Sequence, residues 1–464
     1  FADGKLVVAM SDPSNVVAMD DLRTVTKMDI KPVVATRDDV VTAIDRFSSM
    51  AGDIEAMADD IAGEEEVEDL DQLTSVTEDA PIVKFVNLLV SQAVADGASD
   101  IHIEPTERDL RVRYRIDGVL HEVMRSPKSI QSGVVSRLKI MADVDIAERR
   151  IPQDGRFSVT AGGKSVDLRF STLPTVYGEK IVMRILDKSS ILMTLDDLGF
   201  LDHNLKMFEE SYSKPYGMIL VTGPTGSGKS TTLYATLNVV NTEGVNIVTT
   251  EDPVEYRLGG VNQVQVNPKV GLTFASALRS ILRQDPDVVL VGEMRDRETA
   301  QIGIEAALTG HLVLSTLHTN DAPSAVTRLT EMGIEPFLVG SAVDCVLAQR
   351  LARKVCNRCV DMQRVEAFVL KEAGFDDDIV DERPEVPVAV GCPACSNTGY
   401  RGRLAVHEVM SVTEEIERMT VARASSEDIG RTAVEQGMHT LRQDGLAKVL
   451  MGRTTIEEIG RVVV

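Results

Sequence analysis

The nine residues GPTGSGKST, at positions 223–231, decide the fold because they have the spacing G-x-x-x-x-G-K-[ST]. An apolar run, MILVT, precedes them, and a helix-forming segment that runs to about Asn241 follows them. In the order strand, glycine-rich loop and helix, such a stretch cradles a nucleotide's phosphates with backbone N–H groups and the helix N-terminus. The residues that we expect to contact ATP are Gly223, Pro224, Thr225, Gly226, Ser227, Gly228, Lys229, Ser230 and Thr231.

Four of these positions have separate predicted roles. Gly226 and Gly228 let the backbone approach the phosphates closely, because they lack a side chain. Lys229 is expected to neutralise charge on the β- and γ-phosphates, and the Ser230 hydroxyl is expected to be a ligand of Mg²⁺.

Residues 200–464 have the pattern of an α/β domain. The short apolar runs VNIVTT, VVLVG and HLVLST are separated by helical segments. This alternation predicts a mostly parallel sheet with helices on its faces.

The run VVLV ends in Gly292 and Glu293, within DPDVVLVGEMRD. In nucleotide hydrolases this strand usually ends in an aspartate, whose position Gly292 takes here. We expect Glu293 to polarise the attacking water or to hold Mg²⁺ through water. The alternative is that Glu293 is an ordinary surface glutamate at a strand end. Arg295 and Asp296 are weaker candidates for the site than Glu293.

A second acidic segment, TTEDPVEY, follows the strand expected at 246–250 and contains Glu251, Asp252 and Glu255. The carboxyl ends of strands in such sheets face the ligand crevice. Carboxylates there suit Mg²⁺ coordination and activation of water. Acidic loops are common, so a solvated loop is the competing interpretation.

Two histidines, His311 and His318, stand at the two ends of a short strand in GHLVLSTLHTND. A structural role is the ordinary expectation for an isolated histidine. Beside a γ-phosphate, however, a strand with a histidine at each end could report the nucleotide state to a neighbouring subunit.

Four of the five cysteines form two C-x₂-C pairs, Cys356 with Cys359 and Cys392 with Cys395, separated by 32 residues. Four thiolates suit tetrahedral Zn²⁺ with no open position for catalysis, so we expect a structural zinc subdomain at about 354–400. The fifth cysteine, Cys345, is expected to be buried in a helix.

The chain before the α/β domain divides into three parts. Residues 1–48 read as a small mixed fragment, with strands at KLVVAM and KPVVATR and a helix after Asp38. Residues 49–72 are strongly acidic and predict a linker, with a solvated helix as the alternative. Residues 73–190 predict an α+β domain, because an apolar helical face at 82–93 precedes strictly alternating strands such as LRVRYRID and VDLRFS.

Three arginines in this second domain, Arg156, Arg169 and Arg184, could complete a γ-phosphate site from outside the nucleotide domain. Such an arrangement would couple hydrolysis to domain motion. A solvated sheet face is an equally good interpretation.

Composition narrows the class of protein. The chain has 72 acidic and 49 basic residues among 464, a net charge of −23, which disfavours nucleic acid as a general partner. It has no apolar run of 18 residues, and its first residues lack a secretory signal and read like the interior of a domain. Paired cysteines in a nucleotide-binding chain indicate metal in a reducing compartment.

Taken together and in this order, ASDIHIEP, RYRIDG, PQDGRFS, the phosphate loop, EDPVEY, VGEMRD, HLVLSTLHTN and the two C-x₂-C pairs resemble the secretion and pilus-assembly ATPases. These are the hexameric motors of type II secretion and type IV pilus systems. The resemblance covers residues 75–464, and residues 1–48 resemble the end of the family's N-terminal docking domain. The replacement of aspartate by Gly292 is shared by this family.

This resemblance implies a RecA-like P-loop NTPase domain with a C-terminal helical part, preceded by a PAS-like domain. It implies a homo-hexamer at the cytoplasmic face of the inner membrane that acts on an integral platform protein. It also implies that Glu255 and Glu293 form the hydrolytic centre, that His311 and His318 form a histidine box, and that Arg156 and Arg169 are sensing arginines.

The tetracysteine site and the docking region favour an assembly or secretion motor over a retraction motor, which generally lacks both. Pilus assembly is preferred over type II secretion by a small margin. Two other classes compete: a nucleic-acid translocase on the same core, which the acidic balance opposes, and a nucleotide-gated scaffold without turnover, which Glu255 and Glu293 oppose.

Overall fold

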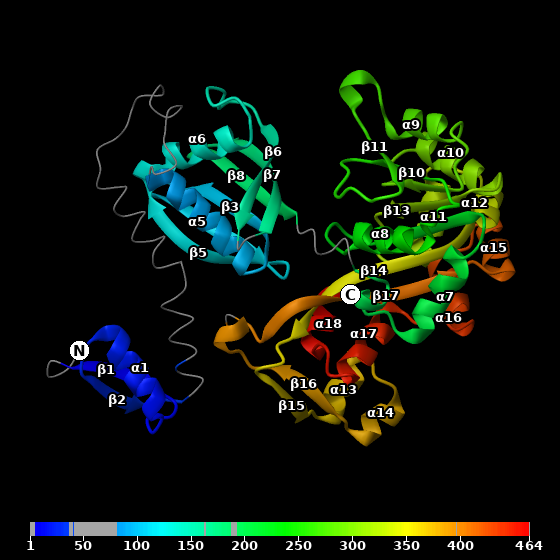
Figure 1. The fold of residues 1–464 in the computed structure, drawn as a ribbon. Helices are drawn as coiled ribbons and strands as arrows, with labels where there is room; N and C mark the ends of the chain where they lie inside the picture. Colours follow the sequence, from blue (N-terminus) through cyan, green and yellow to red (C-terminus); the bar gives the residue numbers. More distant parts are fainter. Residues whose placement is uncertain are drawn as a thin grey trace. The chain divides into compact units, whose positions relative to one another are not determined.

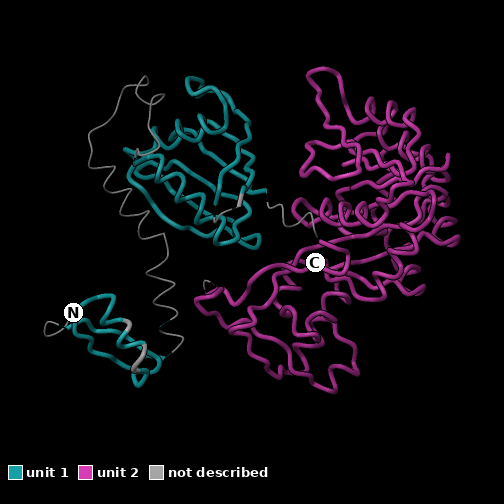
Figure 2. The backbone as a smooth tube through the Cα atoms, in the orientation of Figure 1, with its two compact units in different colours: residues 1–186 teal, residues 187–464 magenta. Residues whose placement is uncertain are grey.

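The computed structural model describes residues 5–36, 40, 81–161, 164–186, 193–395 and 397–463. The chain divides into two compact units, Phe1–Leu186 and Asp187–Val464 (Figure 2). The acidic stretch at 49–72 lies outside the described residues, as does all but Val40 of the helix expected after Asp38.

The first part of unit 1 is a small β–α–β element. Strand β1 (Leu6–Met10) pairs in parallel with β2 (Ile30–Val34), and helix α1 (Val16–Thr26) connects them. The Asn15 side chain accepts a hydrogen bond from the Ala18 N–H and so caps α1. Both predicted strands are confirmed, whereas α1 was not predicted.

The rest of unit 1 is a six-stranded antiparallel sheet with the order β5-β4-β3-β8-β7-β6 (Figure 1). Its apolar face packs on helices α5 and α6, and the Tyr114 hydroxyl on β4 donates to the Leu89 carbonyl on α5 at 2.6 Å. The predicted alternation is confirmed, because Leu110, Val112 and Tyr114 are buried while the arginines between them lie on the other face. The bounds are α5 Pro81–Ala95, β3 Ala98–Pro105, β4 Asp109–Ile116, β5 Val119–Pro127, η1 Lys128–Ile130, α6 Gln131–Met141, β6 Gln153–Ala161, β7 Lys164–Thr175 and β8 Gly178–Leu186.

Unit 2 is built on a seven-stranded sheet with the order β11-β10-β12-β13-β9-β14-β17 (Figure 1). All neighbouring strands are parallel except β14 and β17, so the predicted mostly parallel sheet is confirmed. Alternate residues of these strands enter two separate apolar cores, one on each face of the sheet. The strands are β9 Gly217–Thr222, β10 Ile247–Glu251, β11 Val261–Gln265, β12 Val288–Val291, β13 Leu312–Leu317, β14 Val343–Val355 and β17 Tyr400–Ser411.

Helices cover both faces of this sheet. Helices α7 and α8 contribute to one core, and α9 to α12 contribute to the other together with the C-terminal helices. Among the described helices none is both long and apolar enough to cross a lipid bilayer. The bounds are η3 Asp196–Leu198, α7 Asp202–Tyr212, α8 Lys229–Val240, η4 Pro268–Val270, α9 Phe274–Ile281, α10 Arg297–Leu308, α11 Pro323–Glu331, α12 Pro336–Ala342, α15 Glu414–Val421, α16 Ser426–Glu435, α17 Leu441–Leu450 and α18 Ile456–Val462.

The cysteine-rich insertion lies between the long strands β14 and β17. It contains the antiparallel pair β15 (Val360–Arg364) and β16 (Glu385–Ala389), helices α13 (Ala367–Ala373) and α14 (Asp377–Glu382), and η5 (Pro393–Cys395). The expectation that Cys345 lies in a helix was wrong, because it is a fully buried residue of β14. This strand lies between β9 and β17 and is therefore apolar on both faces, a pattern that does not distinguish a buried strand from a buried helix.

Candidate functional site

The phosphate loop leaves the carboxyl end of β9, between β13 and β14, and enters α8 at Lys229. Gly223, Gly226 and Gly228 have φ angles of 146°, 82° and 89°, which side-chain-bearing residues rarely adopt. A Cβ at Gly223 would lie 2.4 Å from the Gln349 carbonyl oxygen, and one at Gly228 would lie 2.7 Å from the Gln349 amide nitrogen. The loop therefore requires glycine for backbone conformation and for contact with β14.

Lys229 lies inside this loop, where its ammonium donates to the carbonyls of Gly223 at 2.8 Å and Pro224 at 3.0 Å. The pKa of Lys229 is lowered to about 8, chiefly by burial; Glu293 opposes this shift and Arg350 adds to it. The other loop residues differ in exposure: Ser227 is buried, whereas Pro224, Thr225, Gly226 and Ser230 are exposed and Thr231 is half-buried.

Glu293 lies just beyond the carboxyl end of β12, and His318 follows the adjacent strand β13. Its Oε2 is 3.6 Å from Nε2 of His318, and its Oε1 is 2.5 Å from the Arg295 guanidinium. A Cβ at Gly292 would lie 3.2 Å from the Thr250 carbonyl oxygen, so the close approach of β10 explains why glycine occupies this position. The Glu293 carboxylate is held toward the sheet edge that carries the phosphate loop.

Glu251, at the end of β10, is buried and hydrogen-bonded to three donors. Its carboxylate accepts from the Tyr234 hydroxyl, from Thr249 Oγ1 at 2.6 Å and from Gln263 Nε2 at 3.1 Å. Direct binding of a cation by Glu251 would have to compete with these donors. Glu255, four residues further on, is half-buried, and its assignment to the hydrolytic centre stays a prediction.

The two histidines lie at opposite edges of the sheet. Leu312 pairs with Gly217 and Leu317 pairs with Thr222, so His318 is level with Gly223 of the phosphate loop. His311 precedes the strand, about 23 Å away at the rise per residue of a β-strand. Its Nδ1 lies 3.0 Å from the Ala306 carbonyl oxygen. The structure thus brings His318, but not His311, to the phosphate-loop edge of its own sheet.

The arginines of unit 1 form a row across neighbouring strands. Arg156 on β6 pairs with Arg169 on β7, which in turn pairs with Arg184 on β8. Arg184 also donates to Asp100 at 3.0 Å. Like charges directly opposite each other destabilise a sheet. The pairing of these arginines therefore lowers the stability of the folded state unless an anion binds over them. The sensing roles of Arg156 and Arg169 stay predictions.

Four residues that the sequence analysis did not single out connect the loop to the rest of the sheet. Gln349 donates to the Ser227 carbonyl at 2.8 Å and accepts from the Thr232 hydroxyl at 2.7 Å. Thr222 and Thr319 exchange hydrogen bonds next to the loop. No local motif predicts these contacts, because they depend on the register of β9, β13 and β14.

The four paired cysteines converge, with all their sulfur atoms within 4.8 Å of one another. The Sγ–Sγ distances are 3.9 Å for Cys356 with Cys392, and 3.8 Å for Cys395 with both Cys359 and Cys392. Metal–sulfur bonds of about 2.3 Å in a tetrahedron require sulfur separations of about 3.8 Å, so this cluster fits Zn²⁺. Backbone N–H groups of Cys392 and Gly399 donate to Cys395 Sγ, as expected for a thiolate ligand.

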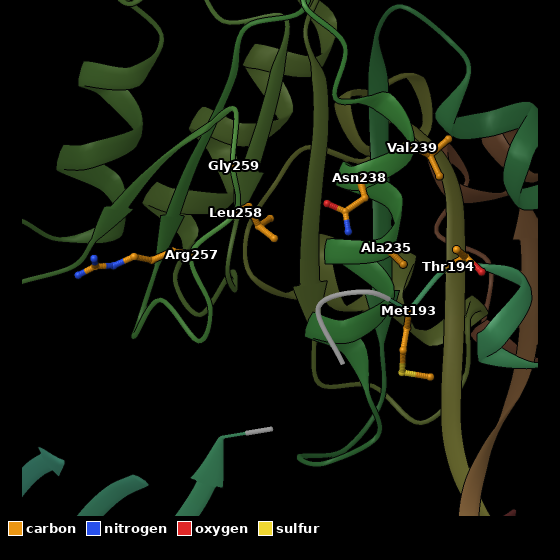
Figure 3. A pocket seen from close by; sticks show the side chains of 8 residues that line it. All are labelled: Met193, Thr194, Ala235, Asn238, Val239, Arg257, Leu258 and Gly259. Atoms are coloured by element: carbon orange, nitrogen blue, oxygen red, sulfur yellow. The ribbon is translucent and has the colours of Figure 1, made fainter. Parts of the chain in front are cut away.

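A pocket of about 400 Å³ lies beside the second half of α8 (Figure 3). Figure 3 shows Asn238 pointing toward Leu258 while Arg257 points away from α8. None of the phosphate-loop positions is among the described residues that line it, so this pocket is separate from the loop. Its lining residues are Met193, Thr194, Ala235, Asn238, Val239, Arg257, Leu258 and Gly259.

The fold and the loop define a class of protein. A mostly parallel sheet with a phosphate loop after the inner strand β9, and a glutamate after β12, which is separated from β9 only by β13, is the arrangement of a RecA-like P-loop nucleotide hydrolase. The chain belongs to the type II/IV secretion system protein family, whose profile matches residues 75–461, and the profile of the MshEN domain matches residues 1–54. It is an ATPase of that family.

The type IV pilus assembly ATPase PilB of Myxococcus xanthus is 49% identical over 466 residues, which cover 99% of this chain and 82% of that protein. The type II secretion system protein E of Pectobacterium carotovorum is 50% identical over 398 residues, or 86% of this chain and 79% of that protein. The pilus retraction motor PilT with bound ADP aligns with a TM-score of 0.55 and 26% identity, over 80% of this chain and 95% of that one. The ATPase DotB of Legionella pneumophila has the same fold, with a TM-score of 0.59 and 20% identity, over 82% of this chain and 95% of that one.

Proposed function

We propose that this protein is a Mg²⁺-dependent ATPase motor that powers type IV pilus assembly. It works as a homo-hexamer at the cytoplasmic face of the inner membrane and acts on an integral platform protein. The observation that carries the proposal is the placement of Lys229, Glu293 and His318 at one sheet edge, in a chain 49% identical to a pilus assembly ATPase.

The roles of these residues follow from their positions. Lys229 binds the β- and γ-phosphates, and Ser230, exposed at the start of α8, is the side chain that would hold Mg²⁺. Mg²⁺ supplies charge neutralisation across the phosphates. Glu293 orients water for attack on the γ-phosphate, and Glu255 supports it. His318 and Arg295 hold the Glu293 carboxylate in place.

Further elements of the site come from other parts of the ring. The row containing Arg156 and Arg169 supplies cations to a γ-phosphate, which accounts for three arginines on adjacent strands. His311 acts across a subunit boundary, because its own phosphate loop lies at the opposite sheet edge. The tetracysteine cluster holds Zn²⁺, which stabilises the insertion between β14 and β17.

Type II protein secretion is the competing function, since a type II secretion protein is 50% identical over 86% of the chain. One experiment separates the two. Lys229 is replaced by Ala on the chromosome, and surface pili and secreted proteins are examined in the same cells. Loss of pili with normal secretion supports the proposal, whereas piliated cells with proteins retained in the periplasm support secretion. Lys206→Ala, on the exposed face of α7, is the matched control.

A further inference from the structure

Arg350 lies on β14 beside the phosphate loop, at a position that the family motifs do not include. Ala348 pairs with Thr222, so Arg350 is level with the residues that follow Gly223. A Cβ at Gly223 would lie 3.2 Å from Nη1 of Arg350, which means that the guanidinium rests against the first residue of the loop.

Among the described residues, the guanidinium is anchored mainly through its Nη2. Its Nη2 donates to Asn320 twice, to the backbone carbonyl at 2.8 Å and to the side-chain oxygen at 3.2 Å. Within the described residues its Nη1, on the side of the loop, donates only to the carbonyl of Gln349 at 3.2 Å, at the long end of hydrogen-bond distances. Asn320 belongs to the turn that follows β13 and carries His318.

Arg350 forms no ion pair with any carboxylate in the part of the chain that the structure describes. Burial lowers its pKa, and the more distant carboxylates of Glu408 and Asp321 oppose that effect. The positive charge of Arg350 also lowers the pKa of Lys229, whose ammonium donates a hydrogen bond to the carbonyl of the same Gly223. Two cations therefore converge on one residue of the loop. A half-buried guanidinium that forms no ion pair with the described carboxylates, and whose Nη1 faces a phosphate loop, is suited to an anionic ligand.

We propose that Arg350 binds the γ-phosphate of ATP from within the same subunit and ties an occupied loop to the turn that carries His318. The guanidinium would bridge the phosphate through Nη1 and Asn320 through Nη2. The presence of the γ-phosphate would thus be transmitted to β14 and to the turn after β13. This inference rests on the proposed binding of ATP at the phosphate loop.

The test measures binding of mant-AMP-PNP and mant-ADP, both with Mg²⁺, to the whole chain and to variants. Arg350→Gln is expected to raise the Kd for the triphosphate at least tenfold and the Kd for ADP less than threefold. Arg350→Lys, which keeps the charge, is expected to recover most of the triphosphate affinity. Lys354→Gln removes an exposed charge on the same strand and should leave both Kd values within twofold of wild type.

An unchanged triphosphate Kd in Arg350→Gln would overturn the inference. So would equal losses for both nucleotides, because a merely distorted loop weakens both. If Arg350→Gln does not fold, Asn320→Ala decides, since loss of the Nη2 anchor should reduce the preference for triphosphate over diphosphate. Lys229→Ala distinguishes a failure of the Arg350 inference from a failure of the proposed ATP site. Unchanged nucleotide affinity in that variant would refute the ATP site itself. If Lys229→Ala weakens nucleotide binding as expected, a negative result for Arg350→Gln refutes only the role of Arg350.

Discussion

His318 Nε2 lies 3.6 Å from Glu293 Oε2, and the two side chains follow adjacent parallel strands, β13 and β12. Arg295 contacts the second oxygen of the same carboxylate. Glu293 is only 14% exposed, so it is held by neighbours rather than by bulk water. A carboxylate fixed in this way at the loop edge is suited to orienting one water molecule.

Glu293→Gln is expected to lower kcat for ATP hydrolysis at least 100-fold, because a positioned general base typically contributes that factor or more. The amide has nearly the same shape, so the Kd for ATP should change less than threefold. Steady-state hydrolysis and mant-ATP binding measure the two quantities. Glu298→Gln, at an exposed ion pair with Arg279, is the control. Turnover within threefold of wild type would exclude Glu293 as the base.

Lys229 makes nucleotide affinity depend on pH in a definite direction. Its pKa is lowered to about 8, chiefly by burial, so the ammonium is mostly charged at pH 7 and loses its proton as the pH rises through 8. An anionic phosphate binds the charged form. The Kd for ATP should therefore be flat up to about pH 8 and rise by up to tenfold per pH unit above it. In Lys229→Ala the weak residual binding should lack this rise; the same rise in the variant would assign it to another group.

His407 should make the protein less stable toward acid. It is fully buried, stacked on Phe200 at 3.7 Å between ring centroids, and burial lowers its pKa well below 6.5. The unfolded chain therefore binds this proton at a pH where the folded chain does not, so stability falls as the pH drops below 6.5. The expected slope is about 1.4 kcal/mol per pH unit at most.

Chemical unfolding between pH 5 and 7.5 measures this effect. His407→Phe keeps the stacked ring and should remove the slope in that window, whereas His439→Gln, at an exposed histidine, should retain it. A slope that survives in His407→Phe would show that other groups cause the loss of stability.

Sequence patterns predicted those parts of the site that depend on local chemistry. The phosphate loop requires glycines and a lysine at set spacings, so positions 223–231 could be placed before any fold was known. Glu293 and His318 could be placed because parallel strands end at a common edge. The cysteine pairs could be grouped because few other arrangements use two C-x₂-C motifs.

Contacts that depend on strand order could not be predicted. Gln349 and Arg350 reach the loop only because β14 pairs with β9, although more than 120 residues separate Gln349 from Ser227 in the chain. The separation of His311 from the loop likewise follows from the register of β13 against β9. Cys345 was assigned to the wrong element, since a strand buried on both faces has no period of two.

Zinc removal should unfold the insertion between β14 and β17 and spare the nucleotide site. Cys356→Ser leaves three ligands for a tetrahedral ion, and structural zinc contributes on the order of 10 kcal/mol to local folding. We expect zinc content to fall from one atom per chain to near zero by atomic absorption, with the Kd for ATP changed less than threefold. Cys345→Ser, at a cysteine outside the cluster, should keep its zinc. Full zinc content in Cys356→Ser would refute the assignment.

Glu251 and Tyr234 allow a structural role to be distinguished from cation binding. Tyr234 on α8 donates to the Glu251 carboxylate at the end of β10, and both residues are buried. Tyr234→Phe removes one donor from a buried carboxylate and should destabilise the protein by about 1–3 kcal/mol in chemical unfolding. Glu251→Gln turns an amide donor toward Thr249, Gln263 or Tyr234 and should destabilise the protein by a similar amount.

If Glu251 only joins α8 to β10, the Mg²⁺ concentration for half-maximal hydrolysis stays within twofold of wild type in both variants. A tenfold rise confined to Glu251→Gln would instead make Glu251 a Mg²⁺ ligand, because Tyr234→Phe leaves that carboxylate in place.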